Sequence, residues 1–164
     1  MRTTKKVALM ALGLVAVGAA SLDAQNNASI NVTASVQQPI TVTAGNALAF
    51  GNVFPGKAAT VAVASASAGT FTVAGQATTP VSMTFVLPTN LTSGAHNLPI
   101  GTWTGNQNTT NAPTGTSFTP SATATPATLS ATGALYVFVG ATVTPAVAQV
   151  AGAYTGTVSM TVTY

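Results

Sequence analysis

Apolar and polar side chains alternate with a period of two along much of the chain. Residues 28–36 show the pattern most plainly, since they read Ala-Ser-Ile-Asn-Val-Thr-Ala-Ser-Val. Successive side chains of a β-strand point to opposite faces of a sheet, so this alternation predicts a strand with one apolar face. That face would consist of Ala28, Ile30, Val32, Ala34 and Val36.

Shorter apolar or alternating runs follow, and Gly, Pro or Asn separates most of them. They lie at 40–43, 48–50, 61–63, 71–73, 81–87 and 98–103. Residues 135–139 are apolar on both faces, which is typical of a central strand that is covered on both sides. Many short strands with frequent turn signals predict an all-β fold, specifically an antiparallel β-sandwich.

A clear alternation also closes the sequence, at residues 153–164. One face of this predicted strand carries Tyr154, Val158, Met160, Val162 and Tyr164. A strand at the edge of a sheet leaves backbone N–H and C=O groups unpaired, and proteins usually block such an edge with charge, proline or a cover. Residues 153–164 contain neither a charged residue nor a proline. We therefore expect this strand to be able to accept another strand beside it.

Residues 105–132 are polar and of low complexity. Asn, Thr, Ser, Pro, Ala and Gly make up most of this stretch, and Phe118 is its one aromatic residue. In a small domain, a stretch of this kind is expected to be a mobile or displayed loop, unless it hides one short edge strand.

The first residues predict a secretory signal peptide. Arg2, Lys5 and Lys6 precede an apolar run at 7–20, and small residues follow that run. This is the layout of a signal peptide, and the run is shorter than the about 20 residues that a membrane-spanning helix needs.

We predict cleavage after Ala24, with Ala20 as the second candidate. The chain would then consist of a signal peptide at 1–24, an N-terminal extension at 25–38 and a β-sandwich domain at 39–164. The mature protein is expected to be secreted through the periplasm to the cell surface or the extracellular space, with no membrane span.

Removal of the signal would leave very little charge. The sequence contains 4 Lys and Arg, 1 acidic residue and 1 His, and Lys57 is the only charged side chain after residue 24. A basic surface for nucleic acid is therefore not expected. Paired carboxylates, a Ser-His-Asp triad, a Cys nucleophile and a metal-binding cluster all need residues that this stretch lacks. We expect no enzyme, no catalytic residue, no cofactor and no metal.

Five short motifs follow one another along the chain. They are Leu48-Ala-Phe50-Gly51, Phe71-Thr-Val73-Ala-Gly75, Val81 to Leu87-Pro88, Val137-Phe-Val139-Gly140-Ala-Thr142, and Gly152-Ala-Tyr154-Thr-Gly156 running on to Tyr164. Their order resembles a family of secreted bacterial β-sandwich proteins of unknown function, which is similar in layout to spore coat protein U and to chaperone-usher pilus subunits. The resemblance implies an antiparallel, immunoglobulin-like β-sandwich that is pilin-like and incomplete.

The resemblance also implies how the sandwich is completed. The N-terminal extension of another copy would supply a donor strand, with Ala28, Ile30, Val32, Ala34 and Val36 on its apolar face. The acceptor strand would carry Tyr154, Val158, Met160, Val162 and Tyr164. The partner would then be the chain itself, in a homopolymer, and an assembly chaperone is a further candidate.

Two functions remain open at this point. The favoured one is a structural subunit of a secreted surface filament, a pilus-like fibre that polymerises by donor-strand exchange. The alternative is a monomeric secreted binding or adhesin module, in which residues 28–36 complete their own sheet and the polar loop or Trp103 contacts a ligand. The alternation of residues 28–36 suits both, because the same face is buried whether the strand pairs within its own chain or with another.

Overall fold

The computed structural model describes residues 26–164, which contain ten β-strands and no helix. The predicted signal peptide lies outside the described residues. Those residues form an N-terminal segment at 26–35 and a body at 36–164. All strand pairs are antiparallel, which confirms the predicted all-β, antiparallel class. Within residues 26–164, no helix could cross a membrane.

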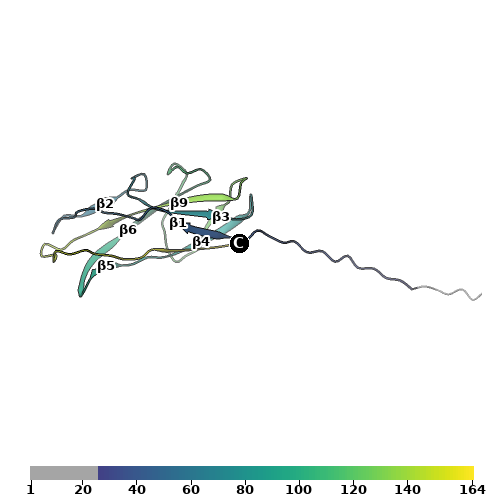
Figure 1. Ribbon diagram of the computed structural model, residues 1–164, viewed down its shortest axis with the longest axis horizontal. Helices are drawn as coiled ribbons and strands as arrows, with labels where there is room; N and C mark the ends of the chain where they lie inside the picture. Colours follow the sequence, from purple (N-terminus) through teal and green to yellow (C-terminus); the bar gives the residue numbers. More distant parts are fainter. Residues whose placement is uncertain (1–25) are drawn as a thin grey trace, which may run out of the picture. The chain divides into compact units, whose positions relative to one another are not determined.

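The larger of two sheets contains seven strands. They are β1 (Thr41–Ala44), β2 (Ala59–Val61), β3 (Gly69–Ala74), β5 (Asn90–Ser93), β6 (His96–Asn108), β7 (Thr116–Phe118) and β9 (Ala134–Val143). Their order is β1-β3-β9-β6-β5, while β2 pairs with β9 and β7 pairs with β6 (Figure 1). β9 lies between β3 and β6, so the prediction of a central strand at 135–139 is confirmed.

The smaller sheet contains three strands in the order β10-β4-β8. They are β4 (Pro80–Val86), β8 (Thr125–Thr128) and β10 (Ser159–Thr163). β4 pairs with both neighbours, with Ser159 opposite Val86 and Val81 opposite Ala127. β8 and β10 are therefore the edges of this sheet.

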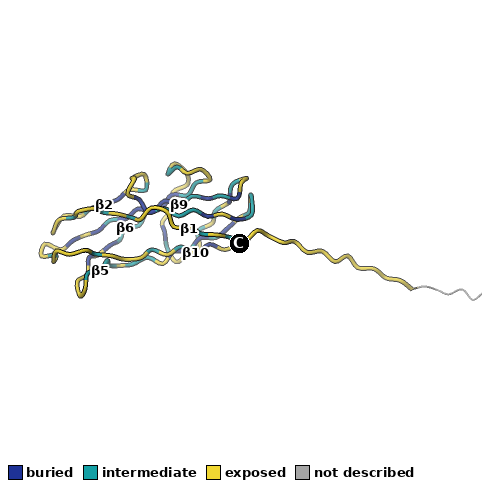
Figure 2. Tube along the Cα trace, in the orientation of Figure 1, coloured by how far each residue is buried: buried dark blue, intermediate teal, exposed yellow. Residues whose placement is uncertain are grey.

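One apolar core joins the two sheets. The larger sheet contributes Val73, Leu135, Val137 and Val139, and the smaller sheet contributes Val81, Met83, Phe85 and Val162. Every second residue of β4 is buried, as its period of two requires. A second cluster lies around Leu98, Ile100, Ala141 and Val143. Figure 2 shows the buried stretches gathered within the body, whereas residues 26–39 are exposed throughout.

Residues 105–132 differ from the expectation of one long polar loop. The end of β6, the whole of β7 and the whole of β8 lie in this range. β7 and β8 have largely exposed side chains, so their sequences carry little apolar alternation. Backbone groups can pair whatever the side chains are. The polar composition of residues 105–132 therefore gave no sign of β7 and β8, and at most one short strand was expected there.

The two outer stretches of the sequence also differ from their expected strands. Residues 28–36 lie outside every strand. Within 153–164, regular pairing begins only at Ser159, and before it Thr155 forms an isolated bridge with Thr92. Within β10 the alternation is as predicted, because Val162 is buried while Thr161 and Thr163 are exposed. Alternation fixes which face a side chain takes but cannot show that a neighbouring strand is present.

Candidate functional site

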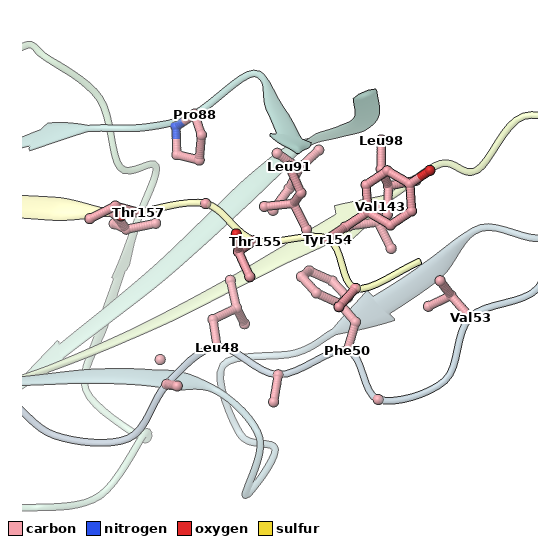
Figure 3. Close-up of a pocket in the computed structure, with 18 of the residues that line it drawn as sticks. Leu48, Phe50, Val53, Pro88, Leu91, Leu98, Val143, Tyr154, Thr155 and Thr157 are labelled. Atoms are coloured by element: carbon pink, nitrogen blue, oxygen red, sulfur yellow. The ribbon is translucent and has the colours of Figure 1, made fainter. Parts of the chain in front are cut away.

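An apolar groove of about 1070 Å³ lies on one side of the body (Figure 3). One wall is formed by residues 44–55, which begin at the last residue of β1. The other wall is formed by residues 149–158, which precede β10. Between them, Leu98, Ile100 and Val143 of the second core cluster form the floor. Half-buried side chains border this floor, namely Leu48, Phe50, Val53, Leu91, Trp103 and Tyr154.

The first wall pairs with the chain on its far side. The amide of Gly45 donates to the carbonyl of Thr70 at 2.8 Å, and the amide of Thr70 donates to the carbonyl of Asn46 at 3.0 Å. Further along, the amide of Ala49 donates to the carbonyl of Ser67 at 3.0 Å. These bonds extend the pairing of β1 with β3, although residues 48–50 form no regular strand. Figure 3 shows Leu48 and Phe50 facing the groove from this wall.

The second wall also pairs away from the groove. The amide of Thr155 donates to the carbonyl of Thr92 at 2.9 Å, and the reverse bond measures 2.8 Å. The Tyr154 hydroxyl donates to the carbonyl of Val150 at 2.7 Å and accepts from Nε2 of Gln149 at 2.7 Å, which fixes the ring beside the floor. Where this wall continues as β10, its one described strand partner is β4.

The groove is closed at one end and open at the other. Its lining stops at Ala44 and Val158, beyond which β1 and β10 lie close together. At the closed end the Tyr164 hydroxyl donates to the carbonyl of Gln38 and accepts from the amide of Gln76. At the other end the lining continues to Phe54 and Val150, both exposed. The groove is thus accessible to a ligand from this open end.

Nearly all of the body matches one protein family. Residues 40–164 match the family described as Domain of unknown function (DUF4402). The chain belongs to this family. The expected membership of a β-rich family of unknown function is therefore confirmed, and the match begins after the exposed N-terminal residues. No curated protein and no solved structure matches the chain.

The five expected acceptor residues take three different places in the DUF4402 domain. Tyr154 and Val158 line the groove. Val162 is buried in the core between the sheets, and Met160 packs against that core. Tyr164 lies beyond the lining, at the closed end, and is 45% exposed. The side chains available to a ligand in the groove are thus those of the irregular stretch before β10.

The five expected donor residues are all exposed and lie outside every strand. Ile30 and Val32 are each 86% exposed, and Val36 is 96% exposed. Such exposure is unusual for large apolar side chains at alternate positions of one segment.

Sequence reasoning missed the first wall of the groove. Leu48 and Phe50 were expected to form an ordinary short strand, and their alternation was the signal that they share an apolar face. That this face borders a groove depends on Leu98 and Val143, which are distant in the sequence.

The rest of the described chain offers little chemistry. Within residues 26–164, no three His, Cys, Asp or Glu residues form a group that could hold a metal ion. Lys57 is exposed directly after the turn at Pro55-Gly56, and His96 is exposed at the start of β6. The groove itself is lined by aliphatic, aromatic and small polar residues and by no charged side chain.

Proposed function

We propose that this protein is a structural subunit of a secreted surface filament that polymerises by donor-strand exchange, in the manner of the pilus subunits and spore coat protein U that its motifs resemble. Residues 28–36 of one copy would lie in the groove of the next. The observation that carries the proposal is the match between an open apolar groove and an exposed segment with apolar residues at alternate positions.

The lengths of the two partners agree. Residues 28–36 comprise nine residues, and the groove wall at 149–158 comprises ten. As an extended strand, each would span about 30 Å at about 3.3 Å per residue. A strand in the groove could therefore pair along the whole wall while every second side chain points to the floor.

The chemistry of the two partners also agrees. Neither residues 28–36 nor the two walls at 44–55 and 149–158 contain a charged side chain, so no charge would lose its water on insertion. Burial of Ile30, Val32 and Val36 would contribute roughly 1.5–3 kcal/mol each, and each ladder hydrogen bond about 1 kcal/mol. These terms are large enough to offset an association cost on the order of 4–15 kcal/mol.

Exposed edges and apolar grooves favour association over a free monomer. No described hydrogen bond joins the wall at 149–158 to the wall at 44–55, and unpaired edges recruit further strands. Lys57 is the one charged side chain among residues 26–164, so copies repel one another weakly.

The central test changes the apolar face of the donor segment and leaves its other face as a control. The full chain is expressed with its leader, and the exported product is examined by electron microscopy and size-exclusion chromatography. We expect fibres from the unchanged protein and monomers from the Ile30→Asp, Val32→Asp variant, because insertion would bury two carboxylates. The control variant Asn31→Asp, Thr33→Asp places the same charges on the opposite face and should still form fibres.

A mixing experiment separates pairing between copies from pairing within one chain. Val158→Asp places a charge in the groove wall and leaves residues 28–36 intact, with Ser159→Asp as the control at the exposed neighbouring position. Mixed with the Ile30→Asp, Val32→Asp variant, it should form 1:1 heterodimers, since one partner keeps a donor segment and the other keeps a groove. Monomers throughout, including the unchanged protein, would instead support a self-completed secreted binding module.

A peptide of residues 26–38 provides a test that needs no polymer. Added to the Ile30→Asp, Val32→Asp variant, it should raise the melting temperature, because a ligand at 100 times its Kd stabilises the folded state by about 2.7 kcal/mol. The same peptide with Asp at both positions 30 and 32 should leave the melting temperature unchanged.

A further inference from the structure

The open end of the groove carries an exposed apolar cluster. Phe54 is 69% exposed, Val147 is 88% exposed and Val150 is 47% exposed. We call these three residues the apolar tip. Single exposed apolar side chains are ordinary, but a cluster that includes an aromatic ring commonly marks an interaction site.

Two turns that hold each other in place carry the tip. The amide of Gly56 donates to the carbonyls of Pro145 and Ala146, at 3.2 and 3.0 Å. Nε2 of Gln149 donates to the carbonyl of Asn97 at 3.0 Å, which ties the second turn to β6. Figure 1 shows these turns at the end of the body away from the C terminus. A surface that is already ordered loses little conformational entropy when it binds.

The tip is continuous with the groove. Phe54 and Val150 line its open end, whereas β1 and β10 lie close together beyond its closed end. At the closed end the chain's own Gln38 is already bonded to Tyr164. A donor segment that fills the groove therefore leaves it over the tip, with Val36 at that end.

The short connection after Val36 then fixes the position of the donor's own body. Ile40 is the first half-buried residue of that body, four residue steps after Val36. Even fully extended, four steps span at most about 14 Å. The end of the donor body that carries Gln38 and the half-exposed Tyr164 is thus held close to the tip of the acceptor copy.

We propose that the apolar tip is a second contact between successive copies, in which Phe54 and Val147 pack against the Tyr164 end of the next body. The contact rests on the proposed function, since the inserted strand brings the two bodies together. It would restrict bending at each junction of the filament, which the short connection at residues 37–39 alone would not do.

The test measures whether Phe54 is covered in the fibre. The sequence contains no Cys, so Phe54→Cys introduces a unique thiol at an exposed position. Its reaction with a maleimide is timed in fibres and in monomers that also carry Ile30→Asp and Val32→Asp. We expect the reaction to be about tenfold slower or more in fibres, because such contacts exclude water from their centre. Val86→Cys, 71% exposed on β4, is the control and should react at similar rates in both states.

The outcomes distinguish the tip contact from strand exchange. Fibres in which Phe54→Cys reacts as fast as in monomers would overturn the tip contact and leave the proposed function intact. Equal slowing at positions 54 and 86 would also overturn it, since that result reports general shielding. Absence of fibres from the unchanged protein would instead remove the proposed function and the tip contact together.

Discussion

The two long sides of the body differ, because the chain closes one of them and leaves the other open. On the side of β7 and β8, one segment of the chain bonds to both sheets. Residues 116–118 pair with β6 of the larger sheet as β7, and shortly afterwards the carbonyl of Ser121 accepts from the amide of Phe85 in β4 at 2.9 Å. Nε2 of Gln107 also donates across the sheets to the carbonyl of Pro126 at 3.1 Å. This side is closed by the chain itself.

The groove side contains no such crossing segment. Its walls at 44–55 and 149–158 each pair outward, and no described hydrogen bond joins one wall to the other. The floor residues Leu98, Ile100 and Val143 are buried beneath half-buried side chains of the groove, but no strand of the body lies between the two walls. The open side therefore does not arise from a lack of apolar residues. It arises because no strand of the body lies there, and for this reason we assign the proposed donor strand to it.

The largest expected effect tests the closed side. The ring of Phe85 is buried and lies 5.6 Å from that of Phe118, between centroids. Phe85→Ala should lower the free energy of unfolding by about 3–5 kcal/mol, because it leaves a cavity between the sheets. The measurement is denaturant unfolding of the monomeric Ile30→Asp, Val32→Asp chain.

The matched control for Phe85 is Phe54→Ala at the open end. Phe54 has no core to leave empty, so its loss should change the same free energy by less than about 0.5 kcal/mol in the monomer. Equal losses at the two positions would contradict the contrast between a closed and an open side.

A smaller effect is expected from the glycine beneath Phe118. A methyl group built on Gly105 would lie 2.5 Å from Cζ of Phe118, so the ring rests directly on this backbone. Gly105→Ala should displace the ring and cost about 1–3 kcal/mol of unfolding free energy. Gly101→Ala, in the same strand, is the control, because a methyl group there meets no atom within 4 Å. Similar stabilities for the two variants would show that Phe118 does not close this side.

The smallest effect concerns the closed end of the groove. Tyr164→Phe removes the hydroxyl that bonds to Gln38 and Gln76, and should cost about 0.5–1.5 kcal/mol of unfolding free energy. Amide hydrogen exchange at Gln76 should become faster in this variant. Tyr136→Phe is the control, since the Tyr136 hydroxyl makes no hydrogen bond within residues 26–164. Unchanged exchange at Gln76 would mean that the hydroxyl does not hold the two segments together.

Much of the strand content followed from local sequence. The alternation of Val81, Met83 and Phe85 predicted a one-sided strand, and the continuous apolar run at 135–139 predicted a central one. β7 and β8 were not predicted, because edge strands with exposed polar side chains pair through the backbone alone. For the groove, the sequence indicated Tyr154 and Val158 but not the opposite wall at Leu48 and Phe50.

The sequence by itself determined which side chains share a face, because the period of two is a local property of extended backbone. It also determined that residues 28–36 and the groove region would be free of charge. Only the tertiary structure decided which edges have neighbours and where the sheets part, since pairing joins residues far apart in the sequence. The open groove between residues 44–55 and 149–158 is a property of that long-range arrangement, and no single segment encodes it.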